Sequence, residues 1–188
     1  MIDTTVKNIS LTMQLDSLED LPEYDVPANY GWRMYAPGDE IVWAQMKISS
    51  EEFESVEQGL KSFRYYFPQE EELPRRMIFL TDGGVPFATA AAWFGDGGHT
   101  PDEGRLHWVS VDKPHQGQGL CKVIVSLAMQ RMRALGHEKA YLTTQTSSWA
   151  AIKVYHRFGF RPAIGSDEET EGWKIVSQKT GIDFLKDK

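Results

Sequence analysis

The sequence has little of several features that define other classes of protein. Among its 188 residues there is one cysteine, Cys121, so an intramolecular disulfide is impossible. Its uninterrupted apolar stretches are a few residues long, whereas a membrane-spanning helix needs about 20 such residues. The N-terminus shows no basic segment followed by an apolar run, so no signal peptide is expected. These absences predict a cytoplasmic protein that does not associate with membranes.

Positive charge is also scarce. There are 20 lysines and arginines against 27 aspartates and glutamates, which gives a formal net charge of −7. An acidic surface repels phosphate backbones, so nucleic acid is not expected as a partner, and cationic substrates such as amines are mildly favoured. The His, Cys and Asp residues do not have the spacing of metal ligands, so no metal site is predicted.

The hydrophobic pattern changes between strand and helix periods along the chain. Strands are expected at 9–15, 31–35, 76–81, 86–94, 104–111, 140–144 and 173–177. Helices are expected at 38–48, 119–135 and 148–158, with another that carries apolar residues from Phe53 to Phe67. Ser49 and Glu52 have the spacing of a capping box that opens this helix, and Pro68 should end it.

The remaining segments and the order of these elements predict the fold class. The two glycines after Asp82 favour a tight hairpin turn, and the acidic run 70–72 is expected to be a solvated loop. Helices come first, then a meander of strands, then alternating strands and helices. This order indicates an α/β protein with a mixed sheet, and one domain over residues 1–188.

The segment that follows the strand at 104–111 carries the strongest chemical signal. It contains the run Gln116-Gly117-Gln118-Gly119-Leu120-Cys121, a glycine-rich turn that opens a helix. The start of a helix presents free N–H groups and partial positive charge, and glycines let a phosphate approach the backbone. A Walker loop is excluded because no Gly-Lys-Ser/Thr ending is present, and the dinucleotide fingerprint fails at Lys122.

This run resembles the Gln/Arg-x-x-Gly-x-Gly/Ala loop of the GCN5-related N-acetyltransferase (GNAT) family, with Cys121 in place of its last glycine or alanine. A second match follows at Ser148-x-x-Ala151-Ile152-x-Val154-Tyr155-x-x-Phe158-Gly159-Phe160. It is similar to the family signature Asn-x-x-Ala-x-x-Leu-Tyr-x-x-x-Gly-Phe, with Ser148 where asparagine is usual. The resemblance is strong over residues 76–165 and weak before them.

The resemblance implies a mostly antiparallel sheet with a splayed pair of central strands and flanking helices. It implies acetyl-coenzyme A as cosubstrate, with residues 76–165 as the cofactor-binding core and residues 1–75 on the substrate side. Residues 116–121 are then expected to hold the pyrophosphate. The other expected cofactor contacts are Val109, Ser110 and Val111, which pair with the pantetheine arm, and Ser148 and Ala151.

Two residues are candidates for catalysis. The resemblance places the hydroxyl of Tyr155 beside the cofactor sulfur, as the acid that protonates the leaving thiolate. His107 occupies the strand position where arylalkylamine N-acetyltransferases carry a catalytic histidine, and Arg105 stands where histone-type members carry a glutamate base. The alternatives are that Tyr155 is one more core aromatic and His107 a structural residue. The aromatic group Trp43, Phe63, Tyr65, Tyr66 and Phe67 is core by its spacing, and by the resemblance it also lines the acceptor pocket.

The predicted function is N-acetyl transfer from acetyl-coenzyme A to a primary amine of a small molecule or peptide. Two alternatives stay open. One is a non-catalytic domain that senses an acyl-coenzyme A, and the other is an acyltransferase for longer acyl chains or hydroxyl acceptors. The family interpretation also allows a homodimer.

Overall fold

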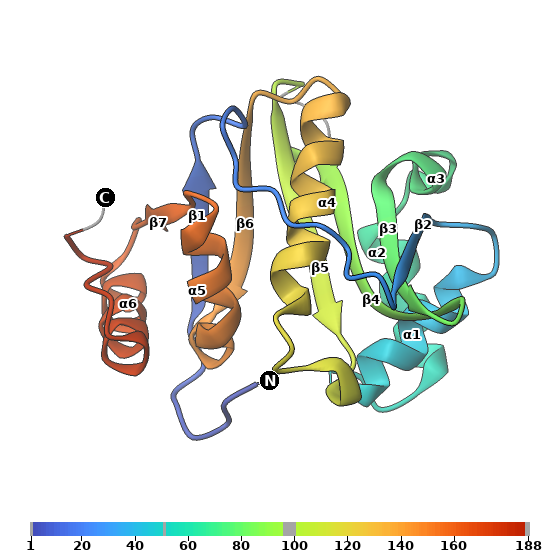
Figure 1. Ribbon diagram of the computed structural model, residues 1–188. Helices are drawn as coiled ribbons and strands as arrows, with labels where there is room; N and C mark the ends of the chain where they lie inside the picture. Colours follow the sequence, from blue (N-terminus) through green and yellow to red (C-terminus); the bar gives the residue numbers. More distant parts are fainter. Residues whose placement is uncertain (1, 51, 96–100, 187–188) are drawn as a thin grey trace. The chain divides into compact units, whose positions relative to one another are not determined.

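The computed structural model describes residues 2–50, 52–95 and 101–186 (Figure 1). The chain divides into two compact units. Unit 1 comprises Met1–Pro22, Phe94–Arg105 and Arg133–Lys188, and unit 2 comprises Glu23–Trp93 and Leu106–Met132. Within the described ranges, none of the helices is long and apolar enough to cross a membrane. The prediction of one domain over residues 1–188 stays a prediction.

Unit 2 is built on an antiparallel meander. Its strands are β2 (Gly31–Met34), β3 (Met77–Asp82), β4 (Val85–Phe94) and most of β5 (Glu103–Val111). β3 pairs antiparallel with β2 on one side and with β4 on the other. Gly83 and Gly84 form the predicted hairpin turn, with φ of 53° and 89°, which a side chain would strain.

The helical elements of unit 2 come before β3 and after β5. They are α1 (Asp39–Ser49), α2 (Val56–Tyr66), η1 (Glu70–Glu72), α3 (Leu73–Arg76), η3 (Lys113–His115) and α4 (Leu120–Ala134), the last of which ends in unit 1. α1 and α2 pack against each other. α2 ends at Tyr66, so Pro68 limits it as predicted.

The predicted capping box at Ser49 and Glu52 is wrong. Ser49 is the last residue of α1, and the N-cap of α2 is Ser55, whose side chain accepts a hydrogen bond from the backbone N–H of Gln58. Glu52 is engaged elsewhere, because its Oε1 accepts from Lys47 Nζ at 3.2 Å and from Ser50 Oγ at 2.8 Å. The helix therefore begins later than the apolar pattern indicates.

The acidic run 70–72 is also not a loop. It forms the short helix η1, which leads directly into α3. Glu72 fixes this turn, since its carboxylate accepts hydrogen bonds from Arg75 Nη1 at 3.1 Å and from Arg76 Nε at 2.8 Å. Arg76 is buried and also donates to the carbonyl oxygen of Ala92 at 3.0 Å.

Unit 1 is centred on strand β1. Its elements are β1 (Ser10–Leu15), the start of β5, β6 (Lys139–Gln145), η4 (Thr146–Ser148), α5 (Trp149–Arg157), β7 (Arg161–Ala163) and α6 (Asp167–Thr180). β1 pairs antiparallel with β6 and with β7, and α6 packs against β1 and α5 (Figure 1).

The strand predicted at 173–177 is instead part of helix α6. Ser166 caps this helix by accepting a hydrogen bond from the backbone N–H of Glu169, and the acidic first turn suits the helix dipole. Trp173 and Val176 are fully buried at a three-residue spacing, and Gly181 ends the helix with φ of 75°. Residues 173–177 resemble a strand when they are considered alone. The N-cap Ser166 and the C-terminal Gly181 are the signals that identify the segment as part of a helix.

The hydrogen-bonded order of the strands is β2-β3-β4-β5-β6-β1-β7. β5 and β6 pair in parallel at Glu103, Gly104 and Arg105, and this pairing ends at Arg105, although β5 continues to Val111. The other described pairings, at β1, β2 and β3, are antiparallel. The prediction of an α/β fold with a mixed, mostly antiparallel sheet and a diverging central pair is confirmed.

Candidate active site

The glycine-rich turn between β5 and α4 is held closed by its own glutamines. Gln116 Nε2 donates to the carbonyl oxygen of Val111 at 2.8 Å, across the short helix η3. Gln118 Nε2 donates to the carbonyl oxygen of Pro114 at 3.1 Å, and its Oε1 accepts from the hydroxyl of Tyr30 at the same distance. These bonds fix the backbone of the turn before any ligand binds.

Glycine is required at two positions of this turn. Gly117 and Gly119 both have φ of 77°, a conformation that side chains rarely adopt. A Cβ atom added at Gly117 would meet nothing within 4 Å, so the backbone there faces open space. At Gly119 the nearest atom would be Lys122 Cε at 3.5 Å. The surface of the turn is therefore accessible backbone.

The N–H groups of this surface are available to a ligand. Within the ranges that the structure describes, the backbone N–H groups from Gly117 to Cys121 donate to no other group. They lie at the start of α4, a helix of 15 residues whose dipole places partial positive charge there. Free N–H groups, positive φ and open space fit the predicted pyrophosphate of coenzyme A at residues 116–121.

The environment of Cys121 argues against a nucleophilic role. The start of a helix normally favours a thiolate, but burial raises the pKa of the Cys121 thiol to about 11. The thiol is therefore protonated near neutral pH. Its place in the turn is that of a small residue that allows the loop to close.

β5 carries a break in its alternation next to His107. Trp108 has φ of 50°, which is rare for a bulky residue, and Leu106 and His107 are buried in succession. Ser110 is buried, while its neighbours Val109 and Val111 are half-buried. A plain strand, as expected from the sequence, would place Leu106 and His107 on opposite faces. Both faces are covered here, because residues 77–81 of β3 and 87–93 of β4 are also buried in succession, so both side chains are buried whichever face they lie on. The irregularity of β5 is the positive φ of Trp108.

Aromatic rings surround His107. Its side chain is 6% exposed, and its ring centroid lies 5.4 Å from that of Phe67 and 5.7 Å from that of Tyr66. Trp43 packs at 5.2 Å against Trp108, the residue that follows. Four of the five aromatic residues expected in the core, Trp43, Phe63, Tyr66 and Phe67, belong to the connected group of rings that includes His107. The fifth, Tyr65, is 77% exposed, so its assignment to the core is wrong.

Lys47 is a charged residue of this region that the sequence did not single out. Its side chain is fully buried at the end of α1, and its Nζ lies 4.8 Å from the ring centroid of Trp108. Burial lowers the pKa of Lys47, while the nearby Glu52 carboxylate opposes this shift. The available signal was one lysine within the apolar pattern of residues 38–48, which is too weak to indicate burial.

Arg105 makes its contacts within unit 1. Its Nη2 donates to Thr143 Oγ1 at 2.8 Å, and its guanidinium lies 5.5 Å from the ring centroid of Tyr141. An influence of this cation on His107 stays a prediction.

The second predicted group lies on α5 in unit 1. Ser148, Ala151 and Tyr155 are three and four residues apart, which places them on one side of this helix. The Oγ of Ser148 accepts a hydrogen bond from Gln145 Nε2 at 3.0 Å. Tyr155 is 7% exposed, and its ring centroid lies 6.3 Å from that of Phe160.

The structure thus groups the predicted residues in two sets. Unit 2 holds His107, residues 109–111 and residues 116–121 on one continuous stretch of chain, and unit 1 holds the face of α5. The roles that the family resemblance gives to these residues stay predictions.

Comparison with known proteins shows the family. Residues 42–160 match the model of the Acetyltransferase (GNAT) family, and the chain belongs to that family. A mycothiol acetyltransferase of Streptosporangium roseum is 36% identical over 67 residues, covering 35% of this chain and 20% of that protein. A mycothiol acetyltransferase of Pseudarthrobacter chlorophenolicus is 26% identical over 147 residues, covering 75% of this chain and 45% of that protein. The chain spans less than half the length of these curated relatives.

Solved structures share the fold. A GCN5-related N-acetyltransferase from Sphaerobacter thermophilus aligns with a TM-score of 0.63 and 18% identity, over 84% of this chain and 49% of that one. A GNAT-family acetyltransferase from Colwellia psychrerythraea aligns with a TM-score of 0.65 and 15% identity, over 84% of this chain and 55% of that one. These comparisons show the family and the fold of this chain.

Proposed function

We propose that this protein transfers an acetyl group from acetyl-coenzyme A directly to a primary amine of a small molecule or peptide. The turn from Gln116 to Cys121 carries this proposal, because it offers free N–H groups at the start of a long helix with glycine at both strained positions. Membership of the GNAT family supports acetyl transfer in general.

The backbone of this chain can perform the binding without basic side chains. N–H groups at residues 117–121 hold the pyrophosphate, and residues 109–111 of β5 pair with the extended arm that follows it. Acetyl-coenzyme A supplies the activated thioester when it is bound. The net charge of −7 favours the approach of a cationic amine over an anionic acceptor.

Two side chains handle the protons in this proposal. His107 accepts the proton of the substrate ammonium, directly or through a water, because only about 0.1% of an alkylamine is neutral at pH 7. The amine nitrogen then forms a bond to the acetyl carbon, and the carbon–sulfur bond breaks. Tyr155 donates its hydroxyl proton to the leaving thiolate, and the nitrogen releases its second proton, which restores the hydroxyl of Tyr155 directly or through water.

A panel assay tests the proposal. The protein is incubated with acetyl-coenzyme A and single amines, and both free thiol and the mass of the acetylated amine are recorded. The proposal expects stoichiometric appearance of thiol and product with at least one amine, and none with the matched alcohol. Binding of acetyl-coenzyme A without thiol release across the panel would contradict it and favour a sensor. Release with alcohols, or only with longer acyl groups, would favour the other acyltransferase.

A further inference from the structure

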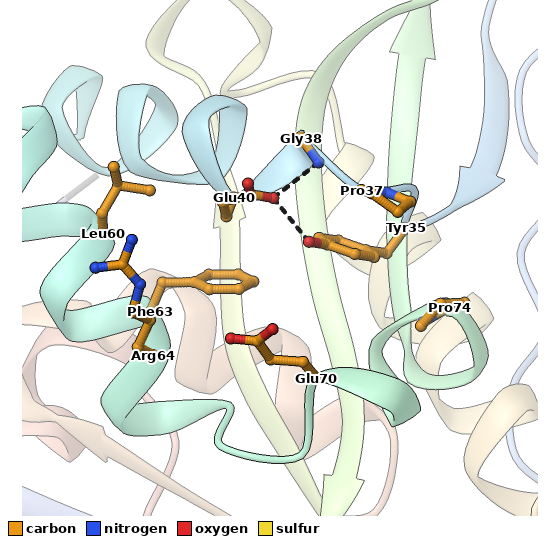
Figure 2. Close-up of a pocket in the computed structure, with 9 residues that line it drawn as sticks. All are labelled: Tyr35, Pro37, Gly38, Glu40, Leu60, Phe63, Arg64, Glu70 and Pro74. Atoms are coloured by element: carbon orange, nitrogen blue, oxygen red, sulfur yellow. Dashed lines mark hydrogen bonds between the residues drawn. The ribbon is translucent and has the colours of Figure 1, made fainter.

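A cavity of about 330 Å³ lies within unit 2, and the predicted catalytic residues are not part of its lining (Figure 2). It is bounded by the start of α1, the last two turns of α2 and the turn formed by η1 and α3. This volume is at the lower end of the range for sites that bind small molecules. Phe63 is the one residue of its lining that belongs to the aromatic group expected to line the acceptor pocket, and the proposed base and acid do not line it.

Two aromatic rings form walls of this cavity. The rings of Tyr35 and Phe63 lie nearly parallel, with an interplanar angle of 20° and centroids 6.1 Å apart. Phe63 is 3% exposed, so its position is fixed by packing. The face of an aromatic ring carries partial negative charge and attracts cations.

The polar groups that face the cavity are mainly acceptors. Glu40 Oε2 accepts hydrogen bonds from the hydroxyl of Tyr35 at 2.7 Å and from the N–H of Gly38 at 2.9 Å. The hydrogen bond from Tyr35 lowers the pKa of Glu40, which keeps this carboxylate ionised. Burial, helped by the charge of Glu40, raises the pKa of Tyr35 far above its ordinary range. The hydroxyl proton of Tyr35 therefore stays in place and is committed to Glu40.

Glu70 supplies a second negative charge. In the part of the chain that the structure describes, its exposed carboxylate has no hydrogen-bond or ion-pair partner. Figure 2 shows this carboxylate directed toward Phe63, on the opposite side of the cavity from Glu40. The guanidinium of Arg64, the one cation of the lining, is directed toward Leu60 instead. Glu70 is exposed, so its charge is accessible to a ligand at the mouth of the cavity.

We propose that this cavity is a binding site for a small organic cation, an alkylammonium or guanidinium group, held between the carboxylates of Glu40 and Glu70 against the ring of Phe63. Such a group supplies N–H donors and positive charge to the two carboxylates, toward which the guanidinium of Arg64 is not directed. His107 does not line this cavity, and Phe67 contacts both rings, with its centroid 4.9 Å from that of Phe63 and 5.4 Å from that of His107. The inference goes beyond the proposed acetyl transfer and does not depend on it.

A titration with n-butylammonium, followed by the backbone amide resonances of the ¹⁵N-labelled protein without acetyl-coenzyme A, tests this site. Binding is expected in the millimolar range for so small a probe. The amide of Gly38 should shift, because it donates to Glu40. n-Butanol, which has a similar size and no charge, should leave this resonance in place.

Two neighbouring carboxylates provide matched variants. Glu70→Gln removes the unpaired charge and keeps the shape of the side chain, so it should weaken binding roughly tenfold. Glu71→Gln removes the same charge from the next residue of η1, which does not line the cavity, and should bind as the wild type does. Equal affinities of the two variants, an equal response to n-butanol, or an unmoved Gly38 amide would each overturn the proposal. His107→Gln should retain binding, which separates this test from that of acetyl transfer.

Discussion

The turn at the start of α4 and the aromatic region of α1 and α2 differ in the groups that form their proposed sites. In the turn, the binding groups are backbone N–H groups, and their geometry demands glycine at Gly117 and Gly119. In the aromatic region, the surroundings of His107 include side chains far from it in sequence, such as Tyr66 and Phe67. The first kind of site leaves a fixed spacing in the sequence, and the second does not.

The largest effect should follow from disruption of the turn. Gly119→Glu places a side chain at φ of 77° and a negative charge beside the proposed pyrophosphate site, so coenzyme A affinity should fall by a hundredfold or more, on the order of several kcal/mol. Calorimetric titration with coenzyme A measures this loss.

Gly136→Glu is the matched control for that variant. Gly136 has φ of 89° just after the other end of α4, and a Cβ there would meet nothing within 4 Å. It therefore carries comparable backbone strain and the same added charge, and coenzyme A should bind as it does to the wild type. Equal losses in the two variants would point to general damage and not to a pyrophosphate site.

The next effect concerns the proposed acid. Tyr155→Phe removes one hydroxyl and leaves the ring to pack, so the melting temperature should stay nearly constant while kcat falls roughly a hundredfold. Steady-state kinetics on an acceptor identified in the panel assay provides the measurement. Tyr65→Phe, at an exposed position, should have no effect. A wild-type kcat in Tyr155→Phe would leave Tyr155 as a core residue.

A smaller and more diagnostic effect concerns the proposed base. If His107 removes the proton, kcat/KM should rise with pH over the range in which histidines titrate, and His107→Gln should lose this rise. A structural role would instead lower the melting temperature and leave the profile unchanged. Arg105→Ala should move the rise to higher pH if the guanidinium disfavours protonated His107. A profile identical in wild type and His107→Gln would remove His107 from the mechanism.

The smallest effect is on stability, at the entrance to α1. Partial burial acts to raise the pKa of Asp39, but hydrogen bonds from Arg33 and the Ala36 N–H outweigh it and leave this pKa below its ordinary value. Asp39→Asn should therefore lower the free energy of unfolding by about 1–2 kcal/mol at pH 7. Since the folded-state pKa is depressed, this contribution is present above the ordinary aspartate pKa and is lost as pH falls through the folded-state value. Urea unfolding at neutral and acidic pH should show the gap close on acidification, and a gap independent of pH would contradict the assignment.

The accuracy of the sequence predictions follows the same division. Positions fixed by local backbone chemistry were predicted well, including the Gly83–Gly84 hairpin and the turn that opens α4. Positions decided by competition between distant groups were not. Glu52 binds Lys47 and so cannot cap α2, and Trp173 belongs to a helix because Ser166 and Gly181 set its ends.

The interior of the substrate-side region was the least predictable. No periodicity distinguishes a buried lysine such as Lys47 from a solvated one, because burial depends on contacts with Trp108 from another element. The break at Trp108 and the cavity between Glu40 and Glu70 are likewise results of tertiary packing. The family resemblance indicated which strand matters, and the structure supplied the positive φ of Trp108 beside a buried His107.

The most direct test of the central claim is a comparison of two ligands on the same amides. Backbone resonances of residues 117–121 are followed while coenzyme A, and separately pantetheine, which lacks the pyrophosphate, is added. The account predicts large shifts at Gly117, Gln118 and Gly119 with coenzyme A, and small ones at these residues with pantetheine. Coenzyme A that binds while these amides stay unmoved would contradict it.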